Sequence, residues 1–401
     1  MADNSTFDVV VSGAGPAGST AARECAAAGL KVALVDKAEF PRDKPCGGGV
    51  TVRCSRMLPF DLSPVSERAI HGVLFSAPGA SISRSAAEPV TYLTQRRHLD
   101  TFLLTKADEE GVSVFQRFPV KGVEAAPRGW TVRSGHQAVS GRFLVAADGA
   151  NGVTARLAGV EVPRWKGIAL EGNITVDPMP QRWRRTISID FGHIRGGYGW
   201  LFPKGDHVNI GLGGWRGSGP TLRTRLDRLV RWYGFDPAGL WNLRGHPLPV
   251  RVPGAPIAAN NIMLVGDAAG FLDPFTGEGI YAAIWSGRAA ARRIIDSGRT
   301  GDPDPCSGYV GDVRAELLPD LRVSRKLADL FHVAPWLWTQ GLRFPRIWAL
   351  ACRLLTGEQS YAGASSSAGL ASSLLSGGYE LLRLVSFARP EAAPRPLLFS
   401  A

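Results

Sequence analysis

The hydrophobic positions at the start of the chain form two short apolar runs on either side of a helix-forming stretch. Residues 9–11 are all valine and predict a buried strand, and residues 32–35 predict a second one. Residues 19–28 are rich in alanine and contain neither Gly nor Pro, which favours a helix that ends at Gly29. The chain therefore opens with a strand, a helix and a second strand.

The turn between the first strand and the helix carries a glycine fingerprint, Gly13-x-Gly15-x-x-Gly18. Gly13 permits the tight turn, Gly15 lets the backbone approach a pyrophosphate, and Gly18 lets helix and strand pack closely. The helix N-terminus presents free N–H groups and a partial positive charge to phosphates. Asp36 ends the second strand and is placed to accept hydrogen bonds from a ribose. The stretch predicts a dinucleotide site, and at this point NAD and FAD are both open.

Two later apolar runs also end on an acid beside a glycine. Residues 143–147 predict a strand that ends at Asp148-Gly149, and residues 261–265 predict one that ends at Gly266-Asp267. Ligands of doubly wound sheets bind at the carboxyl ends of their strands. Gly277 and Gly279 then precede a helix, whose N-terminus would stabilise the negative charge that a reduced flavin ring develops.

Residues 40–50 form a loop, because Pro41, Pro45 and three consecutive glycines (47–49) exclude a regular helix or strand. Cys46 comes directly before the glycines. A free cysteine is most often a small buried hydrophobic residue. Beside a triple-glycine turn, we instead favour a position near a flat ligand.

The hydrophobic period changes to two between residues 167 and 214, which predicts an antiparallel sheet inserted into the α/β domain. Tyr198, Trp200 and Phe202 fall on one face of a strand in this sheet. Two interpretations stay open: these rings form the core of the sheet, or they form an aromatic wall for an apolar ligand.

The last hundred residues predict helices. Residues 313–331 are amphipathic, and an aromatic-rich stretch follows that includes Trp336, Trp338 and Trp348. These rings either pack in a core or line a tunnel mouth or lipid contact. Residues 361–376 are rich in Ser, Gly and Ala and predict a flexible crossing, and residues 378–387 predict a last helix.

Composition and charge narrow the function classes. The five cysteines form no CxxC pair, so neither a disulfide framework, a zinc site nor another metal site is predicted, and a cytoplasmic setting is expected. No apolar run approaches the ~18 residues that span a bilayer, and no signal peptide is expected. The net charge of +11 fits a solvated surface, or attraction to anionic lipid or phosphorylated substrates. The arginines are too dispersed to favour nucleic acid.

The order GxGxxG, Asp-Gly, Gly-Asp resembles the FAD-dependent oxidoreductases of the p-hydroxybenzoate-hydroxylase-like superfamily. The resemblance implies that the first motif holds the ADP part of FAD, that Asp36 holds its ribose and that Asp267 holds its ribityl chain. The chain departs from the second motif, since Gly152 stands where Ser is usual and Arg156 comes one position late. The cofactor-binding residues predicted on this basis are Gly13, Gly15, Pro16, Ala17, Gly18, Asp36, Lys37, Lys44, Cys46, Gly47, Arg96, Asp148, Gly149, Gly266, Asp267, Pro274, Gly277, Gly279 and Ile280.

Within the superfamily, three segments are similar to the geranylgeranyl reductases. They are Pro41-x-x-Lys44-x-Cys46-Gly47-Gly48-Gly49, Tyr198-x-Trp200-x-Phe202-Pro203 and Gly357-Glu358-x-x-Tyr361. The resemblance implies that hydride from reduced FAD saturates double bonds of a geranylgeranyl chain. It gives Cys46, Tyr198 and Trp200 as catalytic residues. It gives Gly48, Gly49, Tyr198, Trp200, Phe202 and Pro203 as substrate-binding residues. NAD(P)H or another reductant such as ferredoxin would supply electrons.

Two other functions stay open on the same fold. One is a flavin-dependent monooxygenase of an aromatic or polyketide substrate, and the other is a lipid-carrier protein without catalysis. The substrate head group also stays open, since a chlorophyll-type ring, a diphosphate, a quinone and a glycerophospholipid all carry prenyl chains. A prenylated small molecule or lipid is the expected partner, with peripheral membrane contact as an open alternative.

The predicted fold class is α/β, with a Rossmann-type FAD-binding domain, an inserted antiparallel-sheet substrate domain and a helical C-terminal region. At 401 residues the chain is long enough for two joined domains. The predicted boundaries are 1–75, 92–165 and 250–300 for the FAD-binding domain, 76–91 and 166–249 for the substrate domain, and 301–401 for the helical region.

Overall fold

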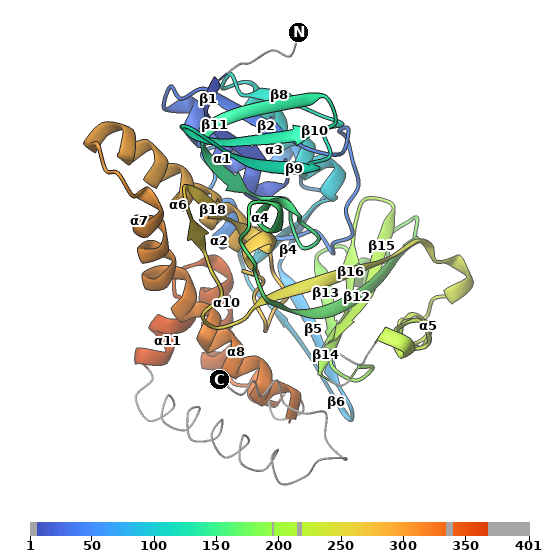
Figure 1. Ribbon diagram of the computed structural model, residues 1–401. Coiled ribbons are helices and arrows are strands. Elements are labelled where there is room, and N and C mark those ends of the chain that lie inside the picture. The colour runs from blue at the N-terminus through green and yellow to red at the C-terminus, as the bar shows by residue number, and fades with distance from the viewer. Residues whose placement is uncertain (1–5, 195, 215–218, 334–339, 368–401) are drawn as a thin grey trace.

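The chain forms two large sheets and a small one, with a layer of helices beside them (Figure 1). The computed structural model describes residues 6–194, 196–214, 219–333 and 340–367. The eight-stranded sheet lies at the top of Figure 1, the seven-stranded sheet at the lower right, and the orange and red C-terminal helices at the left. These helices are α7 (Pro305–Asp312), α8 (Leu318–Val333), α10 (Pro345–Thr356) and α11 (Tyr361–Ser367).

The eight-stranded sheet is built around β1 (Thr6–Ser12), which pairs in parallel with β2 (Val32–Val35) and β11 (Gln137–Ala146). The strand order is β17-β18-β11-β1-β2-β8. The remaining bounds are β17 (Ala258–Ala259), β18 (Ile262–Leu264) and β8 (Ser113–Phe115). A hairpin of β9 (Gly122–Ala126) and β10 (Gly129–Ser134) pairs with β11 through β10. The predicted strand–helix–strand unit is confirmed, and the Rossmann-type fold class with it.

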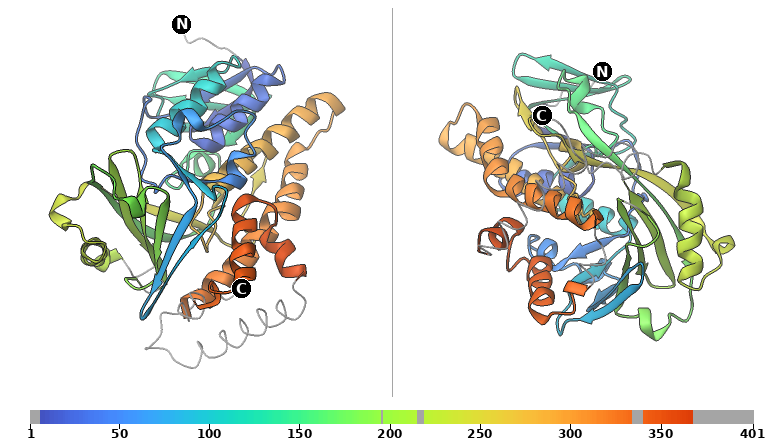
Figure 2. Two further views of the ribbon diagram at one scale, coloured as in Figure 1. Left: turned by 180° about the vertical axis from the view of Figure 1, so that it is seen from behind. Right: turned by 90° about the horizontal axis from the view of Figure 1, so that it is seen from below.

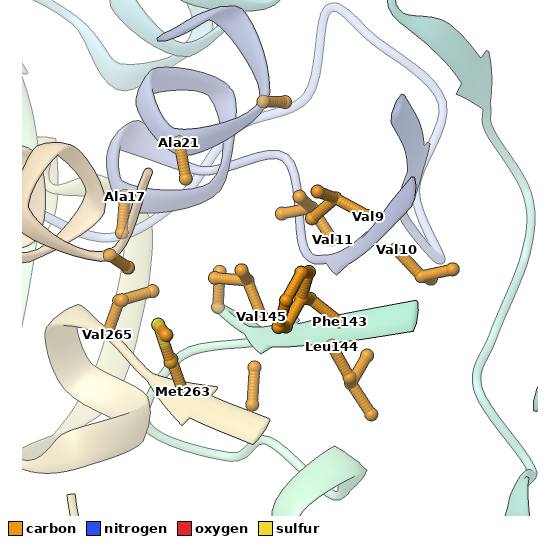
Figure 3. Close-up of a cluster of buried hydrophobic side chains, with 14 of the residues drawn as sticks. Val9, Val10, Val11, Ala17, Ala21, Phe143, Leu144, Val145, Met263 and Val265 are labelled. Carbon is orange, nitrogen blue, oxygen red and sulfur yellow. The ribbon is translucent and has the colours of Figure 1, made fainter. Parts of the chain in front are cut away.

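The core of this part lies where continuous apolar strands meet small-residue helices (Figure 3). Val9, Val11 and Val145 lie fully buried beside Ala21 of α1 (Pro16–Ala27). The long helix α6 (Ile280–Thr300) crosses α1 so closely that a Cβ on Gly287 would lie 2.4 Å from the carbonyl oxygen of Ala17. Small residues therefore set the spacing that brings the N-terminal regions of both helices to one edge of the sheet.

The second sheet has seven strands in the order β16-β12-β15-β14-β13-β5-β6. Their bounds are β16 (Trp241–Arg251), β12 (Arg164–Thr175), β15 (His207–Gly214), β14 (Gly197–Pro203), β13 (Thr186–Asp190), β5 (Gly72–Ala77) and β6 (Ala80–Ser85). The prediction of an antiparallel sheet holds for all of these neighbouring pairs except β5 and β13, which are parallel. Helix α5 (Leu222–Trp232) packs on this sheet through Leu226, Leu229 and Val230.

Shorter elements join the two large sheets. A three-stranded sheet of β3 (Gly49–Thr51), β7 (Thr91–Leu93) and β4 (Arg68–Ile70) lies between them, with α2 (Val52–Ser55) after β3 and α3 (Arg96–Asp108) after β7. Helix α4 (Thr154–Leu157) follows β11, and a π-helical turn (Val313–Leu317) joins α7 to α8. The expected domain boundaries stay a prediction.

The C-terminal prediction is corrected in one place. Residues 361–367 form α11 instead of a flexible crossing, because the Tyr361 side chain is buried and Ala362 N–H donates to the Asp320 carboxylate on α8 at 2.9 Å. Trp336, Trp338 and the helix predicted at residues 378–387 lie outside the described residues. Among the described residues, no helix is long and apolar enough to cross a membrane.

Candidate active site

The first glycine turn lies at the carboxyl end of β1, where backbone groups crowd together. A Cβ on Gly13 would lie 2.5 Å from the Ala147 carbonyl oxygen, and one on Gly18 would lie 1.8 Å from the Gly13 carbonyl oxygen. Gly13 also has a φ of +106°, which other residues rarely adopt. Around Gly15, by contrast, only Nη2 of Arg42 among the described residues would come within 4 Å of a Cβ. Backbone atoms therefore pack tightly against Gly13 and Gly18, whereas Gly15 has free space beside it.

Asp36 stands beside this turn, as the sequence predicts. Its carboxylate accepts the Ala14 N–H at 2.7 Å and the Ala38 N–H at 2.8 Å, one on each oxygen. Each carboxylate oxygen has a second lone pair, so these bonds leave acceptor capacity for ribose hydroxyls. Pro16 and Ala17 begin α1 directly behind the open position, and Lys37 is exposed after Asp36.

The Asp148-Gly149 turn lies beside Gly13, and its acid is used within the chain. Asp148 accepts the N–H groups of Val153 and Thr154 at 2.7 and 2.8 Å. A Cβ on Gly152 would lie 2.2 Å from Asp148 Oδ1. The glycine that departs from the superfamily pattern thus makes room for this carboxylate, which fixes the turn next to the glycine fingerprint.

The third motif meets the 40–50 loop at the same edge. Lys44 Nζ lies 3.3 Å from the Asp267 carboxylate, and a Cβ on Gly279 would lie 3.2 Å from Asp267 Oδ1. Gly279 is the N-cap residue of α6 and offers no side chain to its first N–H groups. Pro274 and Ile280 are buried on either side of the Gly277 turn. The three motifs therefore converge around two helix N-termini, an arrangement that favours anions.

Cys46 lies where this loop crosses the second sheet. Its N–H donates to Glu171 Oε1 at 2.7 Å, and Gly48 N–H donates to its sulfur at 3.4 Å. A Cβ on Gly47 would lie 2.9 Å from the Phe202 ring, and one on Gly48, whose φ is +69°, would lie 1.9 Å from the Thr94 carbonyl oxygen. The glycines after Cys46 thus let the loop lie directly against the aromatic strand. The predicted loop is corrected at its end, because Gly49 and Val50 belong to β3 and pair with β7.

The three rings of β14 follow one another as neighbours along the strand, on one face as predicted. The ring centroids of Tyr198 and Trp200 are 6.0 Å apart, and those of Trp200 and Phe202 are 6.5 Å apart. The Tyr198 hydroxyl donates to the Thr276 carbonyl oxygen in the turn before α6, and burial raises the pKa of its phenol above the ordinary value. Trp200 Nε1–H donates to Asn209 Oδ1 at 2.7 Å. Pro203 ends the strand and is buried.

Arg96 begins α3 in a buried position next to Cys46. Its guanidinium makes two bonds to the Asp100 carboxylate, at 2.7 and 2.6 Å. Arg42 reaches the same carboxylate at 2.9 Å. Burial opposes the charge of Arg96, but Asp100 outweighs it and raises the pKa of Arg96. Arg96 is therefore charged and held in place before it makes the predicted contact with the cofactor.

Sequence reasoning missed two buried charged residues beside the Cys46 turn. Burial raises the pKa of Glu171 to about 7, although the Cys46 N–H and Lys204 act against this shift. Lys204 Nζ donates to the carbonyl oxygens of Gly47 and Thr94 at 2.6 and 2.9 Å, and burial lowers its pKa to about 8. Lys204 directly follows Phe202-Pro203, a signal that could have placed it at the site.

His246 on β16 is a third residue that the sequence did not reveal. Its Nε2 is buried without a hydrogen-bond partner in the part of the chain that the structure describes. Burial lowers its pKa to about 4, as does the nearby Lys44, whereas Asp267 acts in the opposite direction. A buried ring nitrogen without a partner, placed between the loop and the third motif, is available to bond a polar group of a ligand.

These features fit FAD. The open space before Gly15 suits a pyrophosphate, the free acceptor capacity of Asp36 suits a ribose, and the orphaned nitrogen of His246 suits a polar edge of the cofactor. The residues that would hold it are those of the three converging motifs, with Lys44 and Arg96 beside them.

Comparison with known proteins identifies the family of the chain. Residues 6–194 match the family model described as FAD binding domain. The menaquinone reductase of Mycolicibacterium smegmatis is 31% identical over 378 residues, which cover 88% of this chain and 92% of that protein. The digeranylgeranylglycerophospholipid reductase of Methanococcus vannielii is 30% identical over 307 residues, which cover 71% and 76%. A geranylgeranyl bacteriochlorophyll reductase-like structure from Thermoplasma acidophilum is 28% identical, covers 80% of this chain and 88% of its own, and superimposes with a TM-score of 0.71.

The fold, the three motifs and these matches define a FAD-dependent oxidoreductase. Within that class, the chain belongs to the geranylgeranyl reductase family. The predicted cofactor and family are confirmed, while the roles of the individual site residues stay predictions.

Proposed function

We propose that this protein saturates carbon–carbon double bonds in the prenyl chain of a lipid or quinone. The observation that carries the proposal is the contact between the Cys46-Gly47-Gly48-Gly49 turn and the aromatic row of β14, at the edge where the cofactor motifs converge. The names of two relatives, a menaquinone reductase and a digeranylgeranylglycerophospholipid reductase, support a prenylated substrate.

The residues around Cys46 suit the reduction of an unactivated alkene. Reduction of the alkene would use the hydride that FAD supplies when it is bound and reduced by NAD(P)H or another donor. Positive charge would develop on the other carbon, and the neighbouring rings of Tyr198 and Trp200 would stabilise it through cation–π attraction. The Cys46 thiol is our candidate donor of the proton that this carbon takes up.

Glu171 and Lys204 act in this proposal as positioning residues. Glu171 accepts the Cys46 N–H, and Lys204 donates to the Gly47 carbonyl oxygen, so the two hold the peptide group before Cys46 and the one after Gly47. Fixing the backbone on both sides of the thiol keeps the sulfur in one place relative to the aromatic row. A small displacement of such a group lowers the rate strongly.

The test is an anaerobic turnover with the reduced holoenzyme. The enzyme is incubated separately with geranylgeranyl diphosphate, a prenylated quinone and a digeranylgeranyl glycerophospholipid. The masses of the products are measured by mass spectrometry. We expect a gain of two hydrogens for each double bond reduced with at least one substrate. Products that form only with oxygen, and that carry added oxygen, would assign the protein to the monooxygenases instead.

A matched pair of cysteine variants tests the role of Cys46. Cys46→Ala is expected to lower hydrogenation by about a hundredfold, the usual size of a lost general acid, while FAD stays bound. Cys25→Ala, which removes a buried thiol near the C-terminal end of α1, serves as the control and is expected to keep full activity. Unchanged hydrogenation by Cys46→Ala would remove the thiol from the mechanism.

A further inference from the structure

Helix α10 carries both buried and exposed apolar side chains. Its inner face packs Trp348, Cys352 and Leu355 against a cluster of the second and third sheets. Its outer face leaves Phe344, the N-cap residue, 64% exposed, Ile347 40% exposed and Leu350 37% exposed. Exposed large apolar residues at successive turns of one helix are unusual on a soluble surface and mark an interaction site.

The charged residues within α10 are all arginines. Arg343, Arg346 and Arg353 are exposed beside the apolar residues. Residues 330–357 contain no aspartate or glutamate in the sequence. An exposed apolar strip with arginines beside it matches an amphipathic helix that lies in the head-group layer of an anionic bilayer.

Helix α10 is held rigidly at both ends. Arg84 on β6 donates to the carbonyl oxygens of Leu342 and Arg343 just before the helix, and Trp348 Nε1–H donates to the Ser85 carbonyl oxygen. At the other end, Arg56 donates to the Thr356 carbonyl oxygen at 2.9 Å. The helix lies beside β5 and β6 in the right-hand view of Figure 2. Its outer face is therefore pre-formed and needs no ordering on binding.

The inner face of α10 connects this surface to the candidate active site. Trp348, Cys352 and Leu355 pack in the same apolar cluster as Phe202, the last ring of the aromatic row. One apolar cluster therefore links α10 to the residues expected to bind a prenyl chain.

We propose that the outer face of α10 docks the protein on anionic membranes, with Phe344, Ile347 and Leu350 in the head-group layer and Arg343, Arg346 and Arg353 on lipid phosphates. The basic helix α5 is a weaker candidate, because Trp232 is its only large apolar residue described as exposed and Asp227 pairs with Arg223 at 3.0 Å. The alternative occupants of the α10 face are a second copy of the chain and the chain's own residues 368–401.

The experiment is flotation of the FAD-loaded full chain with vesicles of phosphatidylcholine alone or mixed with phosphatidylglycerol. We expect binding to the mixed vesicles that weakens as salt is raised. The combined variant Phe344→Gln, Ile347→Gln and Leu350→Gln is expected to bind these vesicles at least about tenfold more weakly than wild type. The matched control Trp232→Gln on α5 keeps wild-type binding. Flavin absorbance and the unfolding temperature establish that each variant is folded.

Three results would overturn the proposal. One is failure of the full chain to bind anionic vesicles, the result that coverage by residues 368–401 or by a second copy would give. Another is equal binding by wild type and the α10 variant, and the third is loss of binding in Trp232→Gln. Light scattering on the same samples detects a dimer that the α10 variant breaks, which would assign the face to a second copy. Because flotation involves no turnover, its outcome is independent of the proposed reaction.

Discussion

The two large sheets of this protein build their parts of the site by different means. The eight-stranded sheet presents backbone: glycines that leave room, helix N-termini without side-chain caps, and carboxylates bonded to N–H groups, such as Asp36 and Asp148. The seven-stranded sheet presents side chains: a row of aromatic rings with buried ionisable groups, Glu171 and Lys204, at its edge. Backbone recognition suits a fixed cofactor, and a side-chain surface suits a substrate that differs between relatives.

This contrast explains why the buried charges lie where they do. The Cys46 turn belongs to neither sheet and spans the space between them, with Lys44 on the Asp267 motif and Gly47 on Phe202. A turn rich in glycine has high conformational entropy when free. Glu171 and Lys204 compensate for this by bonding its backbone from the side of the second sheet.

The largest effect is expected from a side chain placed in the backbone-built site. In Gly18→Val the added atoms overlap the Gly13 carbonyl oxygen, from which even a Cβ would lie only 1.8 Å away. We expect a loss of at least about 3 kcal/mol of unfolding free energy and no bound FAD. Denaturant unfolding and flavin absorbance of the purified protein measure the two losses.

Gly298→Ala on α6 is the control for Gly18→Val, since a Cβ there meets no described atom within 4 Å. It is expected to leave FAD occupancy unchanged and to stabilise the helix by up to about 1 kcal/mol. Full FAD occupancy in Gly18→Val would show that the turn can rearrange to accept a side chain. The cofactor part of the site would then not depend on backbone packing at Gly18.

A smaller effect, and one specific to the side-chain-built site, is the pH dependence that Glu171 causes. Its pKa rises from the ordinary 4.5 to about 7 in the folded protein, chiefly through burial. The folded state then holds a proton that the unfolded state has released, so stability falls as pH rises from about 4.5 to about 7. Glu171→Gln keeps the shape and an oxygen for the Cys46 N–H but removes this titration.

Between pH about 5 and about 8, wild type should therefore lose about 2 kcal/mol more unfolding free energy than Glu171→Gln. Denaturant titrations at both pH values give the four free energies. Glu124→Gln, which changes an exposed carboxylate paired with Arg133, is the control and should follow wild type. Parallel pH profiles for wild type and Glu171→Gln would mean that Glu171 is ionised in the folded protein at acidic pH.

The same contrast decides how far the sequence alone could predict this site. Gly13 and Gly18 were predictable because a positive φ or a backbone contact admits only glycine, so the residue type reports the geometry directly. Glu171 was not, because a charged residue within an alternating strand normally faces solvent. Its burial depends on the loop around Cys46, which lies 125 positions away. The parallel pairing of β5 with β13 was missed for the same reason, since it depends on contacts between distant segments.

The smallest effect is expected where the two parts of the site meet, at the ion pair of Lys44 with Asp267. The two side chains are about one-fifth exposed and 3.3 Å apart, so water and salt screen their attraction. Lys44→Gln is expected to speed the release of FAD, followed by flavin fluorescence, by about fivefold at low salt and less at high salt.

Lys106→Gln breaks a comparable exposed pair, Lys106 with Glu109 at 2.7 Å, at the C-terminal end of α3. It should not change the rate of FAD release, so it separates an effect of the Lys44 bridge from a general change in surface charge. Equal rates in wild type and Lys44→Gln at low salt would mean that the Cys46 turn is held from the second sheet alone, through Glu171 and Lys204. In that case the bridge would add nothing to cofactor retention, and the two parts of the site would act independently of each other.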